Sequence, residues 1–273
     1  MSSKPVAIIT GGCSGMGEAF ARDLVGQGWQ VALFDLKNNL DLVKDLGDLA
    51  TFHKCNVASY EDQSRGFQDV WKSHGRLDLN YSSLYVFDYR NSDTVPPEPD
   101  LSCTDVNVKG VYFSSQLAIY FMRKNKIPGG NIVITASASS LYPHQSYPEY
   151  SGSKAAVHNF VRAAGRVLKL KDNIRINCIR PGFVATPLAP AAMIAAARPE
   201  NMTPIGTIVK ALNQFLNDET LYGKALECSA EKIIITPEPE FLNGEASERA
   251  SFLWEPGFQH LHHEPSNLPE STP

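Results

Sequence analysis

The order of local patterns at the start of the chain constrains the fold most. An apolar, mostly β-branched run at residues 6–9 predicts a buried strand, and a helical pattern with apolar residues on one side follows residue 17. Residues 10–17 lie between them and have the form T-G-x-x-x-G-x-G. A strand, a glycine-rich turn and a helix predict a nucleotide phosphate site, because glycine lets the backbone approach phosphates and a helix N-terminus offers free N–H groups. The candidate phosphate-binding residues are Gly11, Cys13, Ser14, Gly15, Met16 and Gly17.

A carboxylate follows the second predicted strand, at Asp35. It lies roughly 20 residues beyond the glycine loop, where a carboxylate can accept hydrogen bonds from an adenosine ribose. A negative charge there repels a 2′-phosphate, and neighbouring Leu36 is not basic. Lys37, the nearest cation, softens this preference. We therefore predict NAD as the cofactor, with NADP less favoured.

Apolar runs and helical segments alternate along the rest of the chain. The predicted strands lie near Val6, Val31, Phe52, Leu77, Ile132, Ile176 and Ala225. Such alternation is typical of a parallel sheet covered on both faces, and continuous apolar runs are typical of its buried strands. We therefore predict an α/β fold, a Rossmann-like doubly wound parallel sheet of about seven strands with helices on both faces.

The length of 273 residues suits one such domain, which we expect to cover residues 1–253. From residue 254 the sequence turns polar and proline-rich, which predicts a flexible or surface-draped tail over residues 254–273. The tail holds His260, His262 and His263, but no carboxylate or cysteine cage accompanies them. We expect no metal site there.

Charge, hydropathy and cysteine content exclude several classes of function. A net charge of −4 without a basic stripe argues against a nucleic-acid partner. No apolar stretch is long enough to span a membrane, and the first strand begins too early to leave room for a signal peptide. Five irregularly spaced cysteines without a C-x-x-C motif suggest free thiols in a reducing, cytoplasmic compartment. Cys13 is either an oxidation-sensitive thiol or, as we favour, a small space-filling residue.

Tyr150 and Lys154 have the spacing of a proton relay. Residues i and i+4 of a helix lie on the same face, so both side chains point into one site. A tyrosine phenol has an ordinary pKa of about 10 and is a poor base at neutral pH. A nearby ammonium favours the phenolate and lowers that pKa toward the working range.

The glycine loop and the Tyr150–Lys154 pair together resemble the short-chain dehydrogenase/reductase family, whose own loop has the form found here. The resemblance covers about residues 4–236, with five motifs in order. Ser137 lies thirteen residues before Tyr150, which is the family's spacing for its catalytic serine. The catalytic residues implied are Ser137, Tyr150, Lys154 and Asn107. The cofactor-binding residues implied besides the glycine loop and Asp35 are Asn56, Val57, Tyr150, Lys154, Pro181, Gly182, Val184 and Thr186.

The resemblance implies hydride transfer between a secondary alcohol, or its ketone, and nicotinamide. Tyr150 takes the hydroxyl proton, while Ser137 holds the substrate oxygen by a hydrogen bond that strengthens as charge develops. Lys154 lowers the Tyr150 pKa and bonds the nicotinamide ribose. Asn107 holds a water that links Lys154 to solvent. Asn56, which stands where the family has Asp, can still bond the adenine amino group.

The sequence constrains the substrate less than it constrains the cofactor and the reaction. An apolar stretch at residues 188–197 follows the Pro-Gly turn, where the family has its substrate lid. The candidate substrate-contacting residues are Ser139, Tyr142, His144, Tyr147 and Met193. We expect a hydrophobic small molecule, polycyclic or long-chain, in secondary metabolism. The alternative is that residues 188–197 form a helix packed on the core. A homodimer or homotetramer is expected, paired through the helices that carry Asn107 and Tyr150.

The segment after the fourth strand departs from the family pattern. Ser83, Leu84 and Tyr85 stand where Asn, Ala and Gly are usual, and bulky residues there narrow the cofactor site. The usual Asp-Gly-Gly after the last strand is also absent. A second hypothesis is therefore a non-redox enzyme of this fold, catalysing a cyclisation or isomerisation. A third is a nucleotide-sensing protein without turnover, which the four implied catalytic residues argue against.

Overall fold

The computed structural model describes residues 4–82, 101–187, 189, 191–269 and 271. These residues form one sheet of eight strands in the order β3-β2-β1-β4-β5-β6-β7-β8. The strands are β1 (Val6–Thr10), β2 (Gln30–Asp35), β3 (Ala50–Lys54), β4 (Leu79–Ser82), β5 (Gly130–Thr135), β6 (Ile174–Pro181), β7 (Ala225–Ser229) and β8 (Lys232–Ile235). All neighbouring pairs from β3 to β7 are parallel, and β8 pairs antiparallel with β7. The predicted doubly wound parallel sheet is confirmed.

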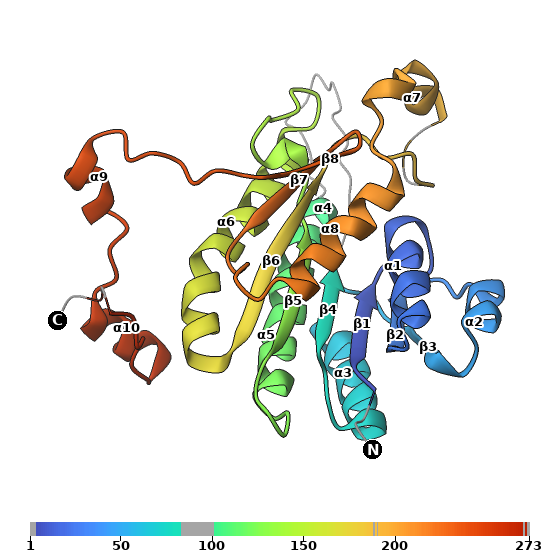
Figure 1. The fold of residues 1–273 in the computed structure, drawn as a ribbon, viewed down its shortest axis with the longest axis horizontal. Coiled ribbons are helices and arrows are strands. Elements are labelled where there is room, and N and C mark those ends of the chain that lie inside the picture. Colours follow the sequence, from blue (N-terminus) through green and yellow to red (C-terminus); the bar gives the residue numbers. More distant parts are fainter. Residues whose placement is uncertain (1–3, 83–100, 188, 190, 270, 272–273) are drawn as a thin grey trace, which may run out of the picture.

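Helices cover both faces of the sheet (Figure 1). One face carries α3 (Tyr60–His74), α5 (Gly110–Met122) and α6 (Pro148–Asp172). The other carries α1 (Gly15–Gly26), α2 (Leu40–Leu46) and α8 (Ile205–Asn217). Each face has its own apolar core. Phe34 and Phe67 belong to the core under α3, α5 and α6, and Phe20 and Phe215 belong to the core on the other face. All four side chains are essentially fully buried. Burial of this kind is the main stabilising contribution to the fold.

Shorter elements connect these helices and strands. They are η1 (Gly47–Leu49), α4 (Ser102–Thr104), the π-helical turn η2 (Asp105–Lys109), η3 (Ala138–Ser140), α7 (Ala191–Ala196), η4 (Pro199–Asn201), α9 (Gly244–Arg249) and α10 (Glu255–His262). In Figure 1, α9 lies apart from the sheet, whereas α10 lies near the C-terminal end of α6. There the Lys171 ammonium is 3.0 Å from the Glu264 carboxylate.

The eighth strand is an addition to the predicted seven. Sequence reasoning missed it because it is a short edge strand of four residues, none of them fully buried. Ala230, with φ of +49°, makes the turn that reverses the chain into it. The fourth strand, predicted near Leu77, spans Leu79–Ser82. Just before it, the Asp78 carboxylate accepts a 2.8 Å hydrogen bond from the Val6 N–H.

The strand order fixes where a ligand can bind. The chain leaves β1 for β2 on one side, while β4 lies on the other side of β1. The loops after these strands therefore separate at the carboxyl edge of the sheet, which is where sheets of this kind bind their ligands. The glycine loop follows β1, which places it at this switch point.

Candidate active site

The glycine loop makes a tight turn against the second strand. Gly11 has a φ of +63°, and its N–H donates a 2.8 Å hydrogen bond to the carbonyl of Phe34. A Cβ on Gly17 would lie 2.1 Å from the carbonyl oxygen of Gly11, so only glycine fits there. The loop thus brings backbone close to backbone immediately before α1.

The N-terminus of α1 lies at the end of this loop. Ser14 is the N-cap residue, with an extended backbone and no side-chain hydrogen bond to the helix. The first-turn N–H groups and the helix dipole therefore remain available to an anion. Met16 is half-buried and packs against the apolar core of this face.

Cys13 is buried under the loop. Its burial raises the pKa of the thiol to about 11. A protonated, enclosed thiol reacts poorly with oxidants, since the thiolate is the reactive form. This favours the space-filling interpretation of Cys13 over the oxidation-sensitive one.

Asp35 is held beside the loop at the end of β2. One carboxylate oxygen accepts a 3.2 Å hydrogen bond from the Cys13 N–H, and the other accepts one of the same length from the Lys37 N–H. The Asn39 side chain adds a 3.0 Å bond to the Cys13 carbonyl. The carboxylate is therefore oriented before any ligand arrives.

Asn56 and Val57 follow β3 at the same edge of the sheet. The Asn56 amide oxygen accepts a 3.1 Å hydrogen bond from the Ala58 N–H, so part of its accepting capacity is used within its own turn. Asn56 is exposed and Val57 is half-buried. The Val57 carbonyl accepts a 2.7 Å bond from Gln63.

Lys154 is buried beneath Tyr150 on α6. Its side chain is enclosed, and burial lowers the pKa of the ammonium to about 8. Its nitrogen lies 5.8 Å from the centroid of the Tyr150 ring and donates a 2.8 Å hydrogen bond to the Thr135 carbonyl. The expected i, i+4 arrangement on one helix is present, with Tyr150 half-buried.

Asn107 lies in the π-helical turn before α5, and turns of this kind are frequent at functional sites. The residue is 1% exposed. Its amide nitrogen donates to the Ser153 hydroxyl at 2.9 Å and contacts the Cys103 sulfur at 3.4 Å. Its amide oxygen is buried and has no partner among the described residues. A buried acceptor of this kind suits a water molecule, as the resemblance implies.

Ser137 caps the turn η3, which packs against α6. Its hydroxyl oxygen accepts a 3.1 Å hydrogen bond from the Ser139 N–H. Its carbonyl accepts a 2.6 Å bond from the Ser140 hydroxyl. Ser137 is half-buried, so the turn presents a hydroxyl group at the carboxyl edge of β5 while fixing its backbone.

The segment after β6 closes over the glycine loop. Pro181 ends the strand, and the Gly182 N–H donates a 2.8 Å hydrogen bond to the Cys228 carbonyl. Val184 is nearly buried. A Cβ on Gly15 would lie 3.5 Å from the Thr186 side chain, so Thr186 contacts the start of α1.

The residues expected to contact substrate are more dispersed. Tyr142 and His144 are exposed, while Ser139, Tyr147 and Met193 are half-buried. The His144 and Tyr147 rings contact each other, with centroids 4.9 Å apart.

Two expectations about neighbouring segments have different outcomes. Met193 lies on α7, which has no buried residue, so this part of the alanine-rich stretch is not packed into the core. The departure at Ser83, Leu84 and Tyr85 lies outside the described residues.

Sequence reasoning missed Arg180, the residue before Pro181. It is fully buried and is the largest such side chain. Its sequence signal was a charge inside the apolar run of β6, a strand that also contains Arg175. No group of three or more His, Cys, Asp or Glu residues in the described ranges could hold a metal ion. Nor does the described chain contain a helix long and apolar enough to cross a membrane.

A glycine-rich turn at the switch point of a doubly wound sheet defines an α/β protein of the dinucleotide-binding class. The glycine cradle at Gly17, the open N-terminus of α1 and the oriented Asp35 carboxylate fit a dinucleotide. The short chain dehydrogenase family model matches residues 5–194. A short-chain dehydrogenase/reductase of Penicillium rubens, prx6, is 43% identical over 95% of this chain and 92% of its own length. The chain therefore belongs to the short-chain dehydrogenase/reductase family.

More distant relatives have named activities. A 3-beta-hydroxysteroid dehydrogenase of Comamonas testosteroni is 30% identical over 69% of this chain and 74% of its own length. Among solved structures, a 3-ketoacyl-(acyl-carrier-protein) reductase from Brucella melitensis, complexed with NADH, covers 82% of this chain and 96% of its own. Its TM-score is 0.74 and its identity 22%, which is a likeness of fold. Family and relatives together support a dehydrogenase or reductase with a nicotinamide cofactor.

Proposed function

We propose that the protein transfers a hydride between a nicotinamide cofactor, preferably NAD, and a secondary alcohol or its ketone on a hydrophobic small molecule. The observation that carries this proposal is the buried Lys154 below Tyr150. A cation enclosed in this way, with its pKa lowered to about 8, costs free energy to bury. Its retention is explained if its charge acts on the Tyr150 phenol.

Four side chains then have distinct tasks. Tyr150 exchanges the proton of the substrate hydroxyl, and Lys154 stabilises the phenolate. Ser137 donates a hydrogen bond to the substrate oxygen, which is most valuable when negative charge develops there. Asn107, whose amide oxygen is buried, holds the water through which Lys154 exchanges protons with solvent.

The cofactor-binding residues are assigned by position. The N-terminus of α1 binds the pyrophosphate, Asp35 binds the adenosine ribose, and Asn56 and Val57 flank the adenine. Pro181, Gly182, Val184 and Thr186 flank the nicotinamide. The orientation of Asp35 by two backbone N–H groups supports a preference for NAD, since it holds negative charge where a 2′-phosphate would lie.

The substrate class is inferred from the site and the relatives. Tyr142, Tyr147 and Met193 give the expected pocket an aromatic and apolar character. One relative is named for a 3-beta-hydroxysteroid and another, from Oryza sativa subsp. japonica, is a momilactone A synthase, 32% identical over 69% of both chains. These names support a bulky, apolar alcohol or ketone.

A titration with NADH and NADPH, read by quenching of tryptophan emission, tests the cofactor assignment. We expect NADH to bind more tightly. Turnover of hydrophobic alcohols and ketones, followed at the absorbance of reduced nicotinamide, tests the reaction. Tyr150→Phe should abolish turnover and leave NADH affinity nearly unchanged. Turnover by this variant at the wild-type rate would refute the proposed role of Tyr150.

The second candidate, a non-redox enzyme of the same fold, rests on the bulky residues Leu84 and Tyr85. It predicts substrate conversion without any change in the reduced-nicotinamide absorbance. Failure of both cofactors to bind at millimolar concentration would favour it.

We also propose a homodimer or homotetramer assembled through α3, α5 and α6. A hollow of about 950 Å³ is lined by residues of these helices, including Tyr60, Tyr112, Tyr120 and Phe160. Ring contacts between Tyr112 and Phe160 and between Tyr60 and Phe113 join the three helices. Exposed aromatic residues on this scale favour a second protein surface.

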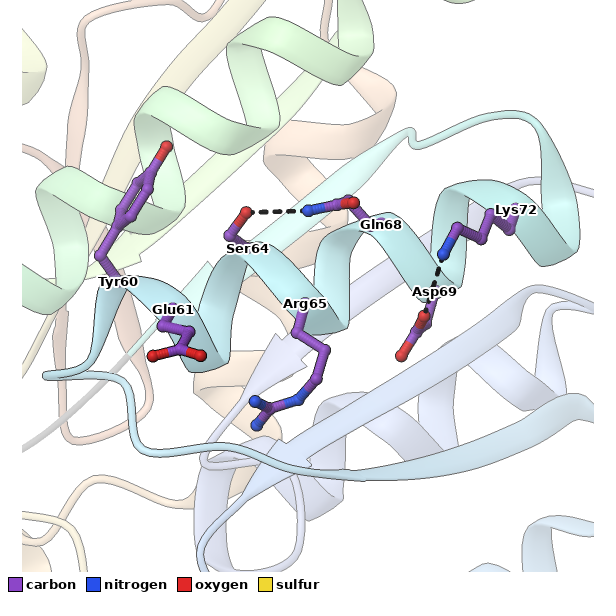
Figure 2. A pocket seen from close by; sticks show the side chains of 7 residues that line it. All are labelled: Tyr60, Glu61, Ser64, Arg65, Gln68, Asp69 and Lys72. Atoms are coloured by element: carbon purple, nitrogen blue, oxygen red, sulfur yellow. Dashed lines mark hydrogen bonds and ion pairs between the residues drawn. The ribbon is translucent and has the colours of Figure 1, made fainter.

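The outer face of α3 continues this surface with a second hollow, which is lined mainly by polar and charged residues (Figure 2). Its lining side chains all come from one helix, with Ser64 bonded to Gln68 and Asp69 paired with Lys72. These are ordinary helix-surface pairs, which fits the rim of an interface rather than a catalytic centre.

The five cysteines are free and buried, which supports a working location in the cytoplasm.

A further inference from the structure

Arg180 is a fully buried cation that contacts the turn η3, which Ser137 caps. It occupies the last position of β6 before Pro181, with 0% of its surface exposed. A buried guanidinium is costly unless its N–H groups are paired. The identity of its partners therefore indicates what the side chain is for.

One set of partners belongs to the turn that carries Ser137. The Arg180 Nε donates a 3.0 Å hydrogen bond to the Ser140 hydroxyl oxygen, and a terminal nitrogen donates at 3.4 Å to the Ala138 carbonyl. The Ser140 hydroxyl in turn donates its proton to the Ser137 carbonyl at 2.6 Å. Two consecutive hydrogen bonds thus connect the guanidinium to the backbone of Ser137.

The other set of partners lies on β7 and immediately after β8. A terminal nitrogen donates a 2.6 Å hydrogen bond to the Thr236 hydroxyl, and another is 3.4 Å from the Glu227 carboxylate. The Tyr142 ring, expected at the edge of the substrate site, lies 5.6 Å from the guanidinium carbon. Arg180 therefore joins the serine turn, Tyr142 and the β7–β8 edge.

We propose that Arg180 is a positioning residue, which acts through Ser140 and Ala138 to fix the orientation of Ser137 in the active site. The inference rests on the proposed function, in which Ser137 holds the substrate oxygen. Arginine suits this task better than lysine because its planar guanidinium donates in several fixed directions at once. A misplacement of about 1 Å of a group that contacts the reacting atoms can cost a factor of about 10² in rate.

A matched pair of variants tests this proposal. Ser140→Ala and Thr236→Val each remove one hydroxyl partner from the same guanidinium, so each leaves one buried N–H group unpaired. Of these two hydroxyl groups, only that of Ser140 connects Arg180 to Ser137. Arg180→Lys is the third variant; it retains the positive charge but loses the planar set of N–H donors. All three are compared in hydrogen–deuterium exchange of the 137–142 segment and in steady-state kinetics.

We expect Ser140→Ala and Arg180→Lys to speed amide exchange in residues 137–142 and to lower kcat by about tenfold or more. The KM for the cofactor should stay within about twofold, because the turn does not hold the cofactor. Thr236→Val should retain the kcat and the exchange rates of the wild type. Equal losses of kcat in Ser140→Ala and Thr236→Val would overturn the proposal, as would wild-type kcat and exchange in Ser140→Ala.

The exchange measurement needs no turnover, which separates this inference from the proposed function. If the wild-type protein binds cofactor but transforms no alcohol or ketone, the proposed function fails. Faster exchange in Ser140→Ala but not in Thr236→Val then still supports Arg180 as the residue that orders the turn. Unchanged exchange in both variants overturns that role.

Discussion

The ammonium of Lys154 donates a 2.8 Å hydrogen bond to the carbonyl of Thr135, the last residue of β5. This bond joins α6 to the sheet directly beneath Tyr150. It also holds the cation away from bulk solvent, and this burial is why the pKa of Lys154 falls to about 8. The same packing therefore sets both the position of the Lys154 ammonium and its pKa. The lowered pKa should make the stability of the protein depend on pH.

The folded-state pKa of Lys154 lies below its ordinary value of 10.5. Burial of the charged form therefore destabilises the fold fully below pH 8, and this penalty is relieved as the pH rises from 8 to 10.5. Lys154→Met removes the penalty at every pH. The stability of the variant relative to wild type should thus fall by about 3 kcal/mol from pH 7.5 to 10.5, at about 1.36 kcal/mol per pH unit.

Urea unfolding of both proteins across this range measures the difference. Because the other titrating groups are the same in both proteins, their contributions largely cancel. Two stability curves that run parallel from pH 7.5 to 10.5 would show that Lys154 keeps its ordinary pKa.

The glycine loop gives a prediction with a control in the same helix. A Cβ at Gly17 would meet the Gly11 carbonyl, whereas a Cβ at Gly26 has nothing within 4 Å. Gly17→Ala should therefore cost about 1–3 kcal/mol in stability and weaken NADH binding at least tenfold. Gly26→Ala should leave binding unchanged and be neutral or stabilising by up to about 1 kcal/mol.

Thermal unfolding and NADH titration of the two variants measure both effects. Equal NADH affinity in Gly17→Ala and wild type would mean that the cofactor does not approach this turn.

Which features the sequence predicted depended on how local their causes are. The glycine loop and the Tyr150–Lys154 pair could be predicted from the sequence, because a tight turn needs glycine within a few residues and a helix aligns positions four apart. The role of Arg180 could not be predicted, because its hydroxyl partners Ser140 and Thr236 lie 40 and 56 positions away in the chain. Only the tertiary fold shows whether a charge within an apolar strand is paired.

The same distinction applies to the edges of the molecule. Continuous apolar runs predicted the seven parallel strands, but β8 is stabilised by pairing with β7 rather than by its own burial. The segment from residue 254 was predicted to be a flexible or surface-draped tail. In the structure it includes α10, and contacts between distant residues such as Lys171 and Glu264 hold it against α6.

Cofactor preference should depend on the charge of Asp35. Asp35→Asn keeps the shape of the side chain and an oxygen that can accept the Cys13 N–H, but removes the negative charge. NADH affinity should fall about tenfold, as expected for losing a charge-assisted hydrogen bond of about 1.5 kcal/mol. NADPH affinity should be retained or rise, because the repulsion of its 2′-phosphate is lost.

Asp45→Asn is the control for net charge. Asp45 is an exposed carboxylate on the neighbouring α2, where it pairs with Arg22 at 3.4 Å. Fluorescence titrations with both cofactors should show wild-type affinities for this variant. If Asp35→Asn leaves the ratio of the two affinities unchanged, the ribose assignment is wrong.

The C-terminal segment should be dispensable for catalysis. It contacts α6 at Lys171, and the 21 positions between Tyr150 and Lys171 correspond to about 31 Å along a helix. Deletion of residues 254–273 removes Glu264 from its pairing with Lys171 and Arg123, so the melting temperature should fall by a few degrees. The kcat and both KM values should stay within about twofold of wild type, because the contact lies roughly 30 Å from the Tyr150 end of the helix.

The full-length Glu264→Ala variant breaks the same ion pairs without shortening the chain, so its melting temperature should fall by less. A deletion variant that stays folded but loses kcat, while Glu264→Ala retains it, would show that the segment reaches an active site.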